Sequence, residues 1–427
     1  MNALIIFLIL AALMLTGMPV SISLGLTVLT FLFGFTDVPL ESVALKLFTG
    51  IEKFEIMAIP FFILAGNFLT HGGVARRMIN FATAMVGHWY GGLGLGGVMA
   101  CALFAAVSGS SPATVVAIGS ILLPAMIKAG FPKRFGAGVI TTSGALGILI
   151  PPSIVMVMYA VATNTSVGAL FMAGVVPGIV LAIVLGLVTW WRARKNNYPR
   201  LPKASWGERW MAFRKSAWGL FLIIVVMGGI YAGIFTPTEA AAMSAVYAFF
   251  VAVFIYKDMG LKDVPKVLLN SANMSAMLLY IITNAVLFSF IMTNENIPQA
   301  MADWMLGHGL GTITFLLAVN VILLLAGNFM EPSSIMLIFA PILFPIAMKL
   351  GIDPIHLGIL MVVNMEVGMC HPPVGLNLYV ASGITKMGIT ELTVAVWPWL
   401  LAMLGFLIAV TYWPTMSLWL PRALGMM

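Results

Sequence analysis

The sequence predicts an all-α polytopic membrane protein, built as an inverted-topology repeat with two re-entrant helical hairpins and two proline-broken helices. Three observations lead to this class. The chain has 427 residues, of which 61% are hydrophobic and only 8% are charged, whereas soluble domains carry about 25% charged residues. Many apolar runs approach or exceed the length needed to span a bilayer. Polar breaks and Gly/Pro positions also recur about 220 residues apart.

The chain begins with apolar runs that we expect to be membrane helices. Runs at 3–17 and 20–35 are separated by Pro19. The first run has no basic segment and no small-residue cleavage site, so we expect a retained helix and not a signal peptide. Residues 41–55 mix charged and apolar residues at helical spacing, which favours a helix lying at the membrane interface. A third membrane helix is expected at 57–69.

A hairpin is the next predicted element, after a short amphipathic helix at 74–86. Apolar runs at 92–107 and 113–127 flank the polar break 108–112. Neither run clearly spans the roughly 30 Å hydrocarbon core, which needs about 20 helical residues. A hairpin that enters the membrane, turns near its midplane and returns therefore explains both runs and the break between them.

A proline-broken helix and a long helix complete this half. The apolar run 135–150 ends at Pro151-Pro152. Proline lacks an N–H and disfavours helical geometry in the preceding residue, so we expect the helix to unwind near Ile150. It should resume over 153–162, and the last helix should cover 167–191.

The second half repeats the first. The recurring residues, at offsets of 218 to 221, are Pro19 with Pro237, Gly87-His88 with Gly307-His308, Pro112 with Pro332, Pro124 with Pro345, Lys128 with Lys349, Gly130 with Gly351, Gly147 with Gly368, Pro151-Pro152 with Pro372-Pro373, and Pro177 with Pro398. Internal duplication is typical of secondary transporters. We therefore divide the chain into a first repeat (1–191), a basic cytoplasmic linker (192–215) and a second repeat (216–427).

The charge distribution predicts that the two repeats are inverted. The first repeat contains five expected crossings, because a re-entrant hairpin crosses zero times, and an odd number inverts the second repeat. Cytoplasmic loops of membrane proteins are enriched in Lys and Arg. With the linker in the cytoplasm, 17 of the Lys and Arg residues lie on the cytoplasmic side and 4 on the other side. Both termini are then periplasmic, the first hairpin opens inward and the second opens outward.

Two polar breaks in apolar surroundings are the expected transport site. The first is the segment Ser108–Thr114 and the second is Gly327–Ser334. Broken helices in membranes line cavities where their free carbonyl groups bind cations and their helix N-termini attract carboxylates. Serine and threonine hydroxyls add further oxygen ligands. Alternatively, these small residues could serve only close helix packing, although two matched clusters, each followed by a Pro-Pro break, favour a binding site.

Acidic residues inside apolar runs are functional hypotheses by default. Glu331 is predicted either to bind a cation or to cap the helix that follows it, and the sequence does not decide between the two. Glu366 is interpreted as a hydrogen-bonded structural acid, although a functional role remains open. Glu239 follows Thr236-Pro237, the outline of a capping box. His371 adjoins the second Pro-Pro break and is expected to form hydrogen bonds.

Other function classes have little support in the sequence. There is no GxxxxGK[ST] nucleotide-binding loop and no nucleophile–base pair, so the chain is not expected to be an enzyme or to use ATP directly. Cys101 and Cys370 are expected to be buried, unpaired cysteines. A channel-like or scaffolding membrane protein is the alternative, but a channel should show a continuous polar stripe, whereas polarity here is confined to two islands.

Several segments together resemble the large membrane subunit of the TRAP transporters, the tripartite ATP-independent periplasmic transporters. These segments are SGSSPAT at 108–114, GILIPPS at 147–153, GIFTPTEAAA at 233–242, AGNFMEPS at 326–333 and PPVGLN at 372–377. The resemblance covers essentially the whole chain and is greatest to the C4-dicarboxylate (DctM) branch. It implies an elevator-type fold, in which a mobile transport domain slides against a fixed scaffold in the bacterial inner membrane.

The resemblance also implies ligands and partners. The coupling ion is expected to be Na⁺ and the substrate a small organic acid. The partners are expected to be a small four-helix membrane subunit (DctQ-type) and a periplasmic substrate-binding protein (DctP-type). Residues expected at the substrate are Ser110, Ser111, Thr114, Ser333, Ser334 and Asn377. Residues expected at the cations are Ser108, Gly109, Ser110, Ser143, Pro151, Asn328, Glu331, Asn364, Gly368 and Pro372.

Overall fold

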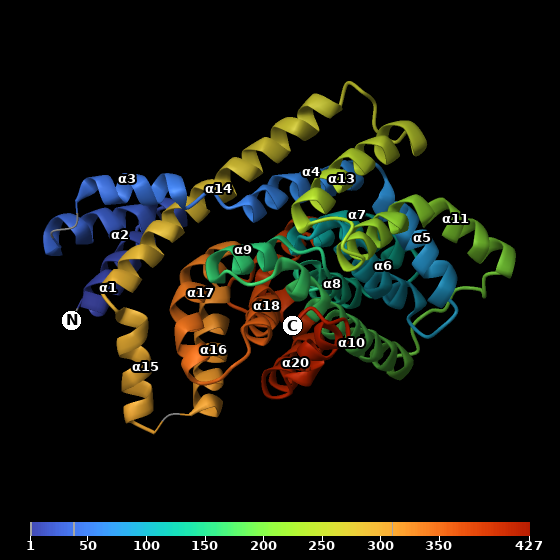
Figure 1. Cartoon of the computed structure of the whole chain (residues 1–427). Helices are drawn as coiled ribbons and strands as arrows, with labels where there is room; N and C mark the ends of the chain where they lie inside the picture. Colours follow the sequence, from blue (N-terminus) through green and yellow to red (C-terminus); the bar gives the residue numbers. More distant parts are fainter. Residues whose placement is uncertain (1, 37–38, 310) are drawn as a thin grey trace.

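The computed structural model describes residues 2–36, 39–309 and 311–427, and the regular elements in these ranges are helices (Figure 1). The helices before the first polar break are α1 (Asn2–Leu15), α2 (Val20–Phe35), α3 (Leu40–Thr49), η1 (Phe54–Met57), α4 (Ala58–His71), α5 (Val74–Val86) and α6 (Gly92–Ser108). Those that follow are α7 (Ser111–Lys128), α8 (Lys133–Ser143), η2 (Gly144–Ile148), α9 (Ile154–Thr163) and α10 (Val167–Lys195).

The rest of the chain continues as helices. They are α11 (Trp206–Ile223), η3 (Ile224–Gly228), α12 (Gly229–Tyr231), α13 (Pro237–Phe250), η4 (Val251–Ile255), α14 (Val264–Asn294) and α15 (Ile297–Gly307). The remaining ones are α16 (Thr312–Gly327), α17 (Pro332–Lys349), α18 (Pro354–Cys370), α19 (Leu376–Thr385), α20 (Ile389–Tyr412) and α21 (Thr415–Ala423). Among the described residues, eight helices are long and apolar enough to cross a membrane.

The helices form two packing groups. In the first, which we call the frame, α4 packs on α13 and α14, and α14 also packs on α2 and α3. In Figure 1, α14 runs diagonally from the N-terminal helices toward α4 and α13. In the second group, the hairpin unit, α8 packs on α7 and α20, α9 packs on α17, and α18 packs on α16 and α10. The hairpin unit therefore contains both polar breaks.

Each predicted hairpin is present as two packed helices joined by a short turn. Helices α6 and α7 are joined by Gly109 and Ser110, and Gly109 has a φ of 60°, in the left-handed region that glycine adopts readily. Residues 328–331 join α16 to α17. The first break is shorter than the expected 108–112 range, because Ser111 and Pro112 already belong to α7. Proline is tolerated there because the first helical N–H groups have no intrahelical partner.

The expected interruptions at both Pro-Pro pairs are confirmed. Helix α8 ends at Ser143, earlier than expected, and continues as the 3₁₀ helix η2, which ends at Ile148 just before the Pro-Pro pair. The second broken helix stops at Cys370 and resumes at Leu376. The peptide bonds Pro151–Pro152 and Pro372–Pro373 are both cis.

Two segments differ from their expected extent. The predicted interfacial helix at 41–55 ends at Thr49 and is followed by a turn and the short helix η1. The basic segment 192–215 is non-helical only over 196–205, because α10 continues to Lys195 and α11 starts at Trp206. Ser205 and Glu208 form a capping box that starts α11. This capping box lies within the segment that the basic charge predicts to be a linker.

Other expectations of local structure are confirmed. Glu239 accepts hydrogen bonds from the backbone N–H and the hydroxyl of Thr236, which completes the predicted capping box at α13. Cys101 and Cys370 are buried and unpaired.

Candidate transport site

The two polar breaks meet at one cavity between the frame and the hairpin unit. The cavity has a volume of about 500 Å³, within the range of small-molecule sites. Residues 108–113 of the first hairpin and Glu331–Ser333 of the second line it. The frame contributes residues from α4 and α14, and Ile148, Ile154 and Val155 come from the first broken helix. Residues more than 200 positions apart in sequence therefore share one chamber.

Hydrogen bonds hold the tip of the first hairpin in shape. The hydroxyls of Ser108 and Thr114 lie 2.9 Å apart, and the Thr114 hydroxyl donates to the Ser110 carbonyl at 2.8 Å. No described side chain caps α7, whose N-cap residue is Ser110. The N-terminus of α7 therefore presents unpaired backbone N–H groups, which favour an anion.

The tip of the first hairpin is anchored to both broken helices. The Ser111 hydroxyl donates to the Gly144 carbonyl at 2.9 Å, and the buried Asn377 amide donates to the Ser111 hydroxyl at 2.8 Å. A Cβ atom at Gly147 would lie 2.5 Å from the Ser110 carbonyl oxygen. Only glycine allows the hairpin backbone to approach this closely.

The second hairpin has a similar close approach. Gly327, at the end of α16, faces Gly368 of α18, and a Cβ added to either glycine would lie 3.0 Å from the Cα of the other. The Asn328 amide turns to the second break, where its nitrogen donates to the carbonyls of His371 and Pro372, each at 3.1 Å. His371 therefore contributes to this junction through its carbonyl and its ring, which lies 3.0 Å from the Asn328 amide.

Glu331 caps α17 in this structure. Its carboxylate accepts hydrogen bonds from the backbone N–H groups of Ser333 and Ser334, at 3.1 and 2.9 Å, and from the Ser334 hydroxyl at 2.9 Å. Of the two roles predicted for Glu331, cation binding and helix capping, this geometry corresponds to capping. Unlike α7, α17 thus has its first N–H groups satisfied by a carboxylate, so only the first hairpin presents a free, positively polarised helix N-terminus to the cavity.

Several buried polar atoms next to the breaks have no partner among the described residues. They include the Ser143 hydroxyl and the Asn364 side-chain oxygen, although the Asn364 nitrogen donates to Asn320 at 2.9 Å. Ser143 and Asn364 are 221 positions apart, the offset of the repeat. Unpartnered buried oxygens cost free energy unless a ligand uses them. Each half therefore holds a buried oxygen that is available to a ligand.

Glu366 differs from its interpretation as a hydrogen-bonded acid. Its side chain is fully buried in α18, and neither carboxylate oxygen has a hydrogen-bond partner among the described residues. The second half therefore holds a buried acid between two residues, Asn364 and Gly368, that the sequence analysis assigned to cation binding.

The predicted substrate residues are close together but are not equally accessible. Ser110, Ser111 and Ser333 line the cavity. Thr114, Ser334 and Asn377 are buried behind it and hydrogen-bond to residues at the hairpin tips. Among the predicted cation residues, Ser108, Gly109 and Glu331 also line the cavity. Pro151 and Pro372 lie in the two breaks.

The frame supplies cavity residues that the sequence analysis did not identify. They are Ile63, Gly66, Asn67, Thr70, Met274, Met277 and Leu278. Asn67 and Thr70 are polar residues within an otherwise apolar run of α4, and this signal was available in the sequence. The Asn67 amide donates to Ser271 of α14 at 2.8 Å, which links the two frame helices beside the cavity.

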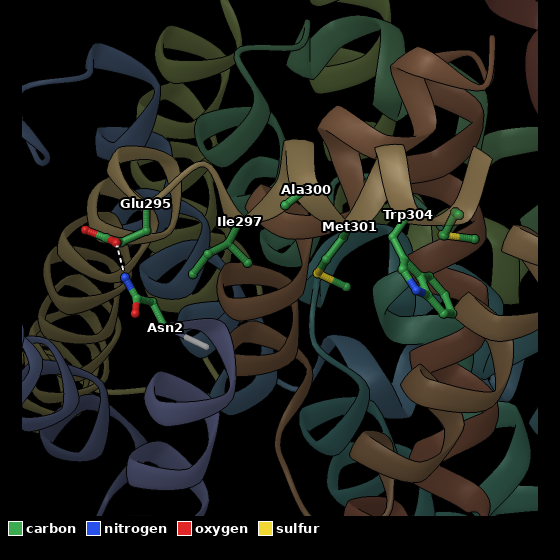
Figure 2. Close-up of a pocket in the computed structure, with 7 residues that line it drawn as sticks. Asn2, Glu295, Ile297, Ala300, Met301 and Trp304 are labelled. Carbon is green, nitrogen blue, oxygen red and sulfur yellow. Dashed lines mark hydrogen bonds between the residues drawn. The ribbon is translucent and has the colours of Figure 1, made fainter. Parts of the chain in front are cut away.

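A second hollow, of about 490 Å³, lies between the start of α1, the turn that follows α14, and α15. Figure 2 shows its lining, with Asn2 and Glu295 joined by a hydrogen bond of 2.7 Å and with Met301 and Trp304 along α15. It contains none of the predicted site residues and neither hairpin tip. The polar chemistry expected of a transport site is therefore concentrated in the first cavity.

The residues that line the first cavity carry an unusual charge balance for an anion site. They include one carboxylate, Glu331, and no lysine or arginine. Any positive charge that an anion meets there must come from helix N-termini or from bound cations. An enclosed anion without such compensation is strongly disfavoured in an apolar environment.

The Glu331 cap leads to a testable prediction. Replacing Glu331 with alanine removes the acceptor for two backbone N–H groups, and should lower the free energy of unfolding by about 1–2 kcal/mol. Replacing it with glutamine keeps an acceptor oxygen and should cost less. Thermal unfolding of the purified variants measures both effects. If the alanine variant is as stable as the original chain, the cap is energetically unimportant.

Comparison with known proteins places the chain in a family. Residues 7–416 match the family model of the "Tripartite ATP-independent periplasmic transporter, DctM component". The chain belongs to the DctM family. It is therefore a multi-pass membrane component of a bacterial TRAP transporter and not an enzyme, as the motifs in its sequence indicated.

Individual relatives extend this match over the full length. The chain is 76% identical to the "C4-dicarboxylate TRAP transporter large permease protein DctM" of Rhodobacter capsulatus, with 100% of both chains covered. It is 41% identical to the "Isethionate TRAP transporter permease protein DctMQ" of Oleidesulfovibrio alaskensis, over 96% of this chain and 64% of that protein. Among solved structures, the Alcanivorax borkumensis YdaH transporter matches 88% of both chains with a TM-score of 0.62 at 15% identity. This likeness shows that the chain and the YdaH transporter share a fold.

Proposed function

We propose that this DctM-family chain is the permease of a Na⁺-coupled importer, and that it carries a small dicarboxylate between its two hairpin tips. The convergence of both tips on one cavity whose lining contains a carboxylate and no basic residue is the observation that carries this proposal. A dicarboxylate cannot occupy such a cavity as an uncompensated charge. Coupled cations supply the compensation, and their gradient supplies the driving force.

Backbone groups of the first hairpin offer the anion its first contacts. Helix α7 starts at the cavity with no side-chain cap, so its free N–H groups and positive dipole end face the lining. The hydroxyls of Ser110 and Ser333 come from opposite hairpins and suit the two ends of a dicarboxylate. The α17 N-terminus is already neutralised by Glu331, so the first hairpin is the stronger anion site.

Two Na⁺ sites are proposed behind the tips, one in each half. Each combines a hairpin turn with the broken helix packed against it: Ser108–Ser110 with Ser143 and the Pro151 break, and Asn328 with Asn364 and the Pro372 break. The unpartnered oxygens of Ser143 and Asn364 support these sites. Na⁺ is a hard cation that binds carbonyl and hydroxyl oxygens, which broken helices provide in transporters.

The substrate class rests on the relatives and on the size of the site. The Rhodobacter capsulatus relative, 76% identical, is named as a C4-dicarboxylate permease. A relative named for isethionate, another small organic acid, is 41% identical. We therefore propose C4-dicarboxylates as substrates of this chain.

The inverted repeat and the elevator motion are part of the same proposal. Helices α7 and α17 both have 18 residues, and α9 and α19 both have 10. At 18 residues α7 and α17 are long enough to cross a membrane, so the re-entrant interpretation rests on their tight turns and not on arm length. The frame helices α4 and α14 also pack on the hairpin helices α6 and α17, and this contact is the proposed surface along which the hairpin unit slides past the frame. The termini are proposed to be periplasmic.

Two partners complete the proposed system. They are a small four-helix membrane subunit and a periplasmic protein that delivers the substrate. The family description names a tripartite system. The DctMQ relative supports the small subunit, because this chain matches 64% of its length and leaves room for a second component in one polypeptide.

Uptake into proteoliposomes tests the proposed function. The chain is reconstituted with the small subunit and the binding protein, and uptake of succinate, malate, fumarate and sialic acid is measured with and without an inward Na⁺ gradient. We expect uptake of the C4-dicarboxylates only with the gradient and without ATP. Equal uptake without a gradient would favour the channel-like alternative, and a requirement for ATP would refute secondary transport.

A further inference from the structure

A basic pocket of about 450 Å³ lies away from the transport cavity, where the start of α5 meets α11 and the end of η4. Its lining residues are Arg76, Arg77, Asn80, Arg214, Lys215, Trp218, Ile255, Tyr256 and Asp258. Four of these are cations and one is an acid, so the pocket has a net charge of +3. Neither the family match nor the transport cycle assigns a role to this pocket.

Part of the pocket's charge is already used within the protein. Arg77 forms an ion pair with Asp258, and its guanidinium stacks on the Tyr256 ring at 3.8 Å from the ring centroid. Arg76, Arg214 and Lys215 are exposed and have no carboxylate within 4.0 Å among the described residues. Arg77 is thus a fixed wall of the pocket, and the other three cations are available to a ligand.

An apolar surface continues from the pocket. Trp218 is 47% exposed, and Phe221 on the same helix is also about half exposed. Phe221 follows Trp218 by one helical turn, so both lie on one side of α11. A free anion would bind to the basic side chains and would make no contact with these aromatic side chains. A ligand with a charged headgroup and long apolar chains would contact both the basic and the aromatic side chains.

We propose that this pocket binds the headgroup of an anionic phospholipid. The phosphate lies between Arg76, Arg214 and Lys215, and the acyl chains follow Trp218 and Phe221 along the surface of α11. Basic pockets between membrane helices bind anionic headgroups, and tryptophan favours the level of the headgroups. The bound headgroup contacts both α5 and α11. Helix α5 connects α4 of the frame to α6, the first arm of the hairpin.

Titration with phospholipids, followed by native mass spectrometry of the purified full chain, tests this proposal. We expect phosphatidylglycerol to bind at least tenfold more tightly than phosphatidylcholine. The double variant Arg214→Gln with Lys215→Gln should lower affinity for phosphatidylglycerol roughly 20- to 30-fold, because each basic residue near an anionic membrane surface contributes about fivefold. All substituted side chains are exposed, so the fold should be retained.

The matched control is Lys262→Gln with Lys266→Gln, which removes the same charge from exposed residues outside the pocket. It should leave the affinity for phosphatidylglycerol within twofold of the original. Equal losses in both double variants would mean that only overall charge matters and would overturn the proposal. A separate arm uses glycerol phosphate without acyl chains. Binding as tight as that of phosphatidylglycerol would identify a simple anion site and also overturn the proposal.

Discussion

Replacing Gly147 with alanine is expected to reduce dicarboxylate uptake about 100-fold while leaving the chain folded. The added Cβ would lie 2.5 Å from the Ser110 carbonyl oxygen and 2.7 Å from the Ser111 Cα, both backbone atoms. The hairpin tip must therefore move away from the first broken helix. Displacements approaching 1 Å in a binding constellation cost about two orders of magnitude in function. Uptake into proteoliposomes and thermal unfolding of the same preparation measure the two effects.

Gly405→Ala is the matched control. Gly405 lies within α20, and nothing lies within 4 Å of the position that its Cβ would occupy. Alanine is the better helix former by about 1 kcal/mol, so this variant should be at least as stable as the original and should transport normally. Normal uptake by the Gly147 variant would show that transport does not require the close contact between the hairpin tip and the first broken helix.

Replacing Ser143 with alanine is expected to increase the Na⁺ concentration required for uptake without lowering the stability of the chain. The buried hydroxyl has no partner among the described residues, so its removal should leave stability in Na⁺-free buffer unchanged or raise it by about 1 kcal/mol. If this oxygen binds Na⁺, the Na⁺ concentration for half-maximal uptake should rise roughly tenfold. This factor assumes that the contact between the oxygen and the ion contributes about as much free energy as one hydrogen bond to a charged group. Thermal unfolding with and without Na⁺, together with uptake, provides both measurements.

Ser23→Ala is the control for this experiment. Ser23 is another fully buried serine whose hydroxyl has no partner, but it lies in α2 of the frame. Its replacement should change stability in the same direction and leave the Na⁺ dependence unaltered. A Ser143 variant with the Na⁺ response of the Ser23 variant would remove Ser143 from the cation site. Asn364→Ala should raise the Na⁺ requirement in the same way, but it should also lower stability, because it removes the hydrogen bonds from the Asn364 amide to Asn320.

Local rules predicted most of the fold. Glycine and proline positions marked the turn at Gly109, the interruption at Pro151 and their repeats in the second half, because these residues act through backbone geometry that the sequence alone determines. Element ends were less predictable. The 3₁₀ helix η2 that follows Ser143 contains Gly147, which packs against Ser110 in a contact between distant segments that no local rule describes.

The positions of the two hairpin tips at the candidate site were predictable from the sequence, but the contacts between them and their neighbours were not. Polar breaks in apolar runs identified both hairpin tips, because lipid does not satisfy free backbone groups. The choice between capping and cation binding at Glu331 required the positions of the Ser333 and Ser334 N–H groups. The contribution of α4 and α14 to the cavity required tertiary structure, since helices far apart in sequence form its walls.

An electron cryomicroscopy map of the complete transporter with Na⁺ and succinate tests the central claim most directly. We predict density for the dicarboxylate in the cavity between Ser110 and Ser333, against the N-terminus of α7. Density for cations should lie beside Ser143 and Asn364, behind the two turns. Succinate bound elsewhere on the chain, with the cavity between the hairpin tips empty, would contradict this account.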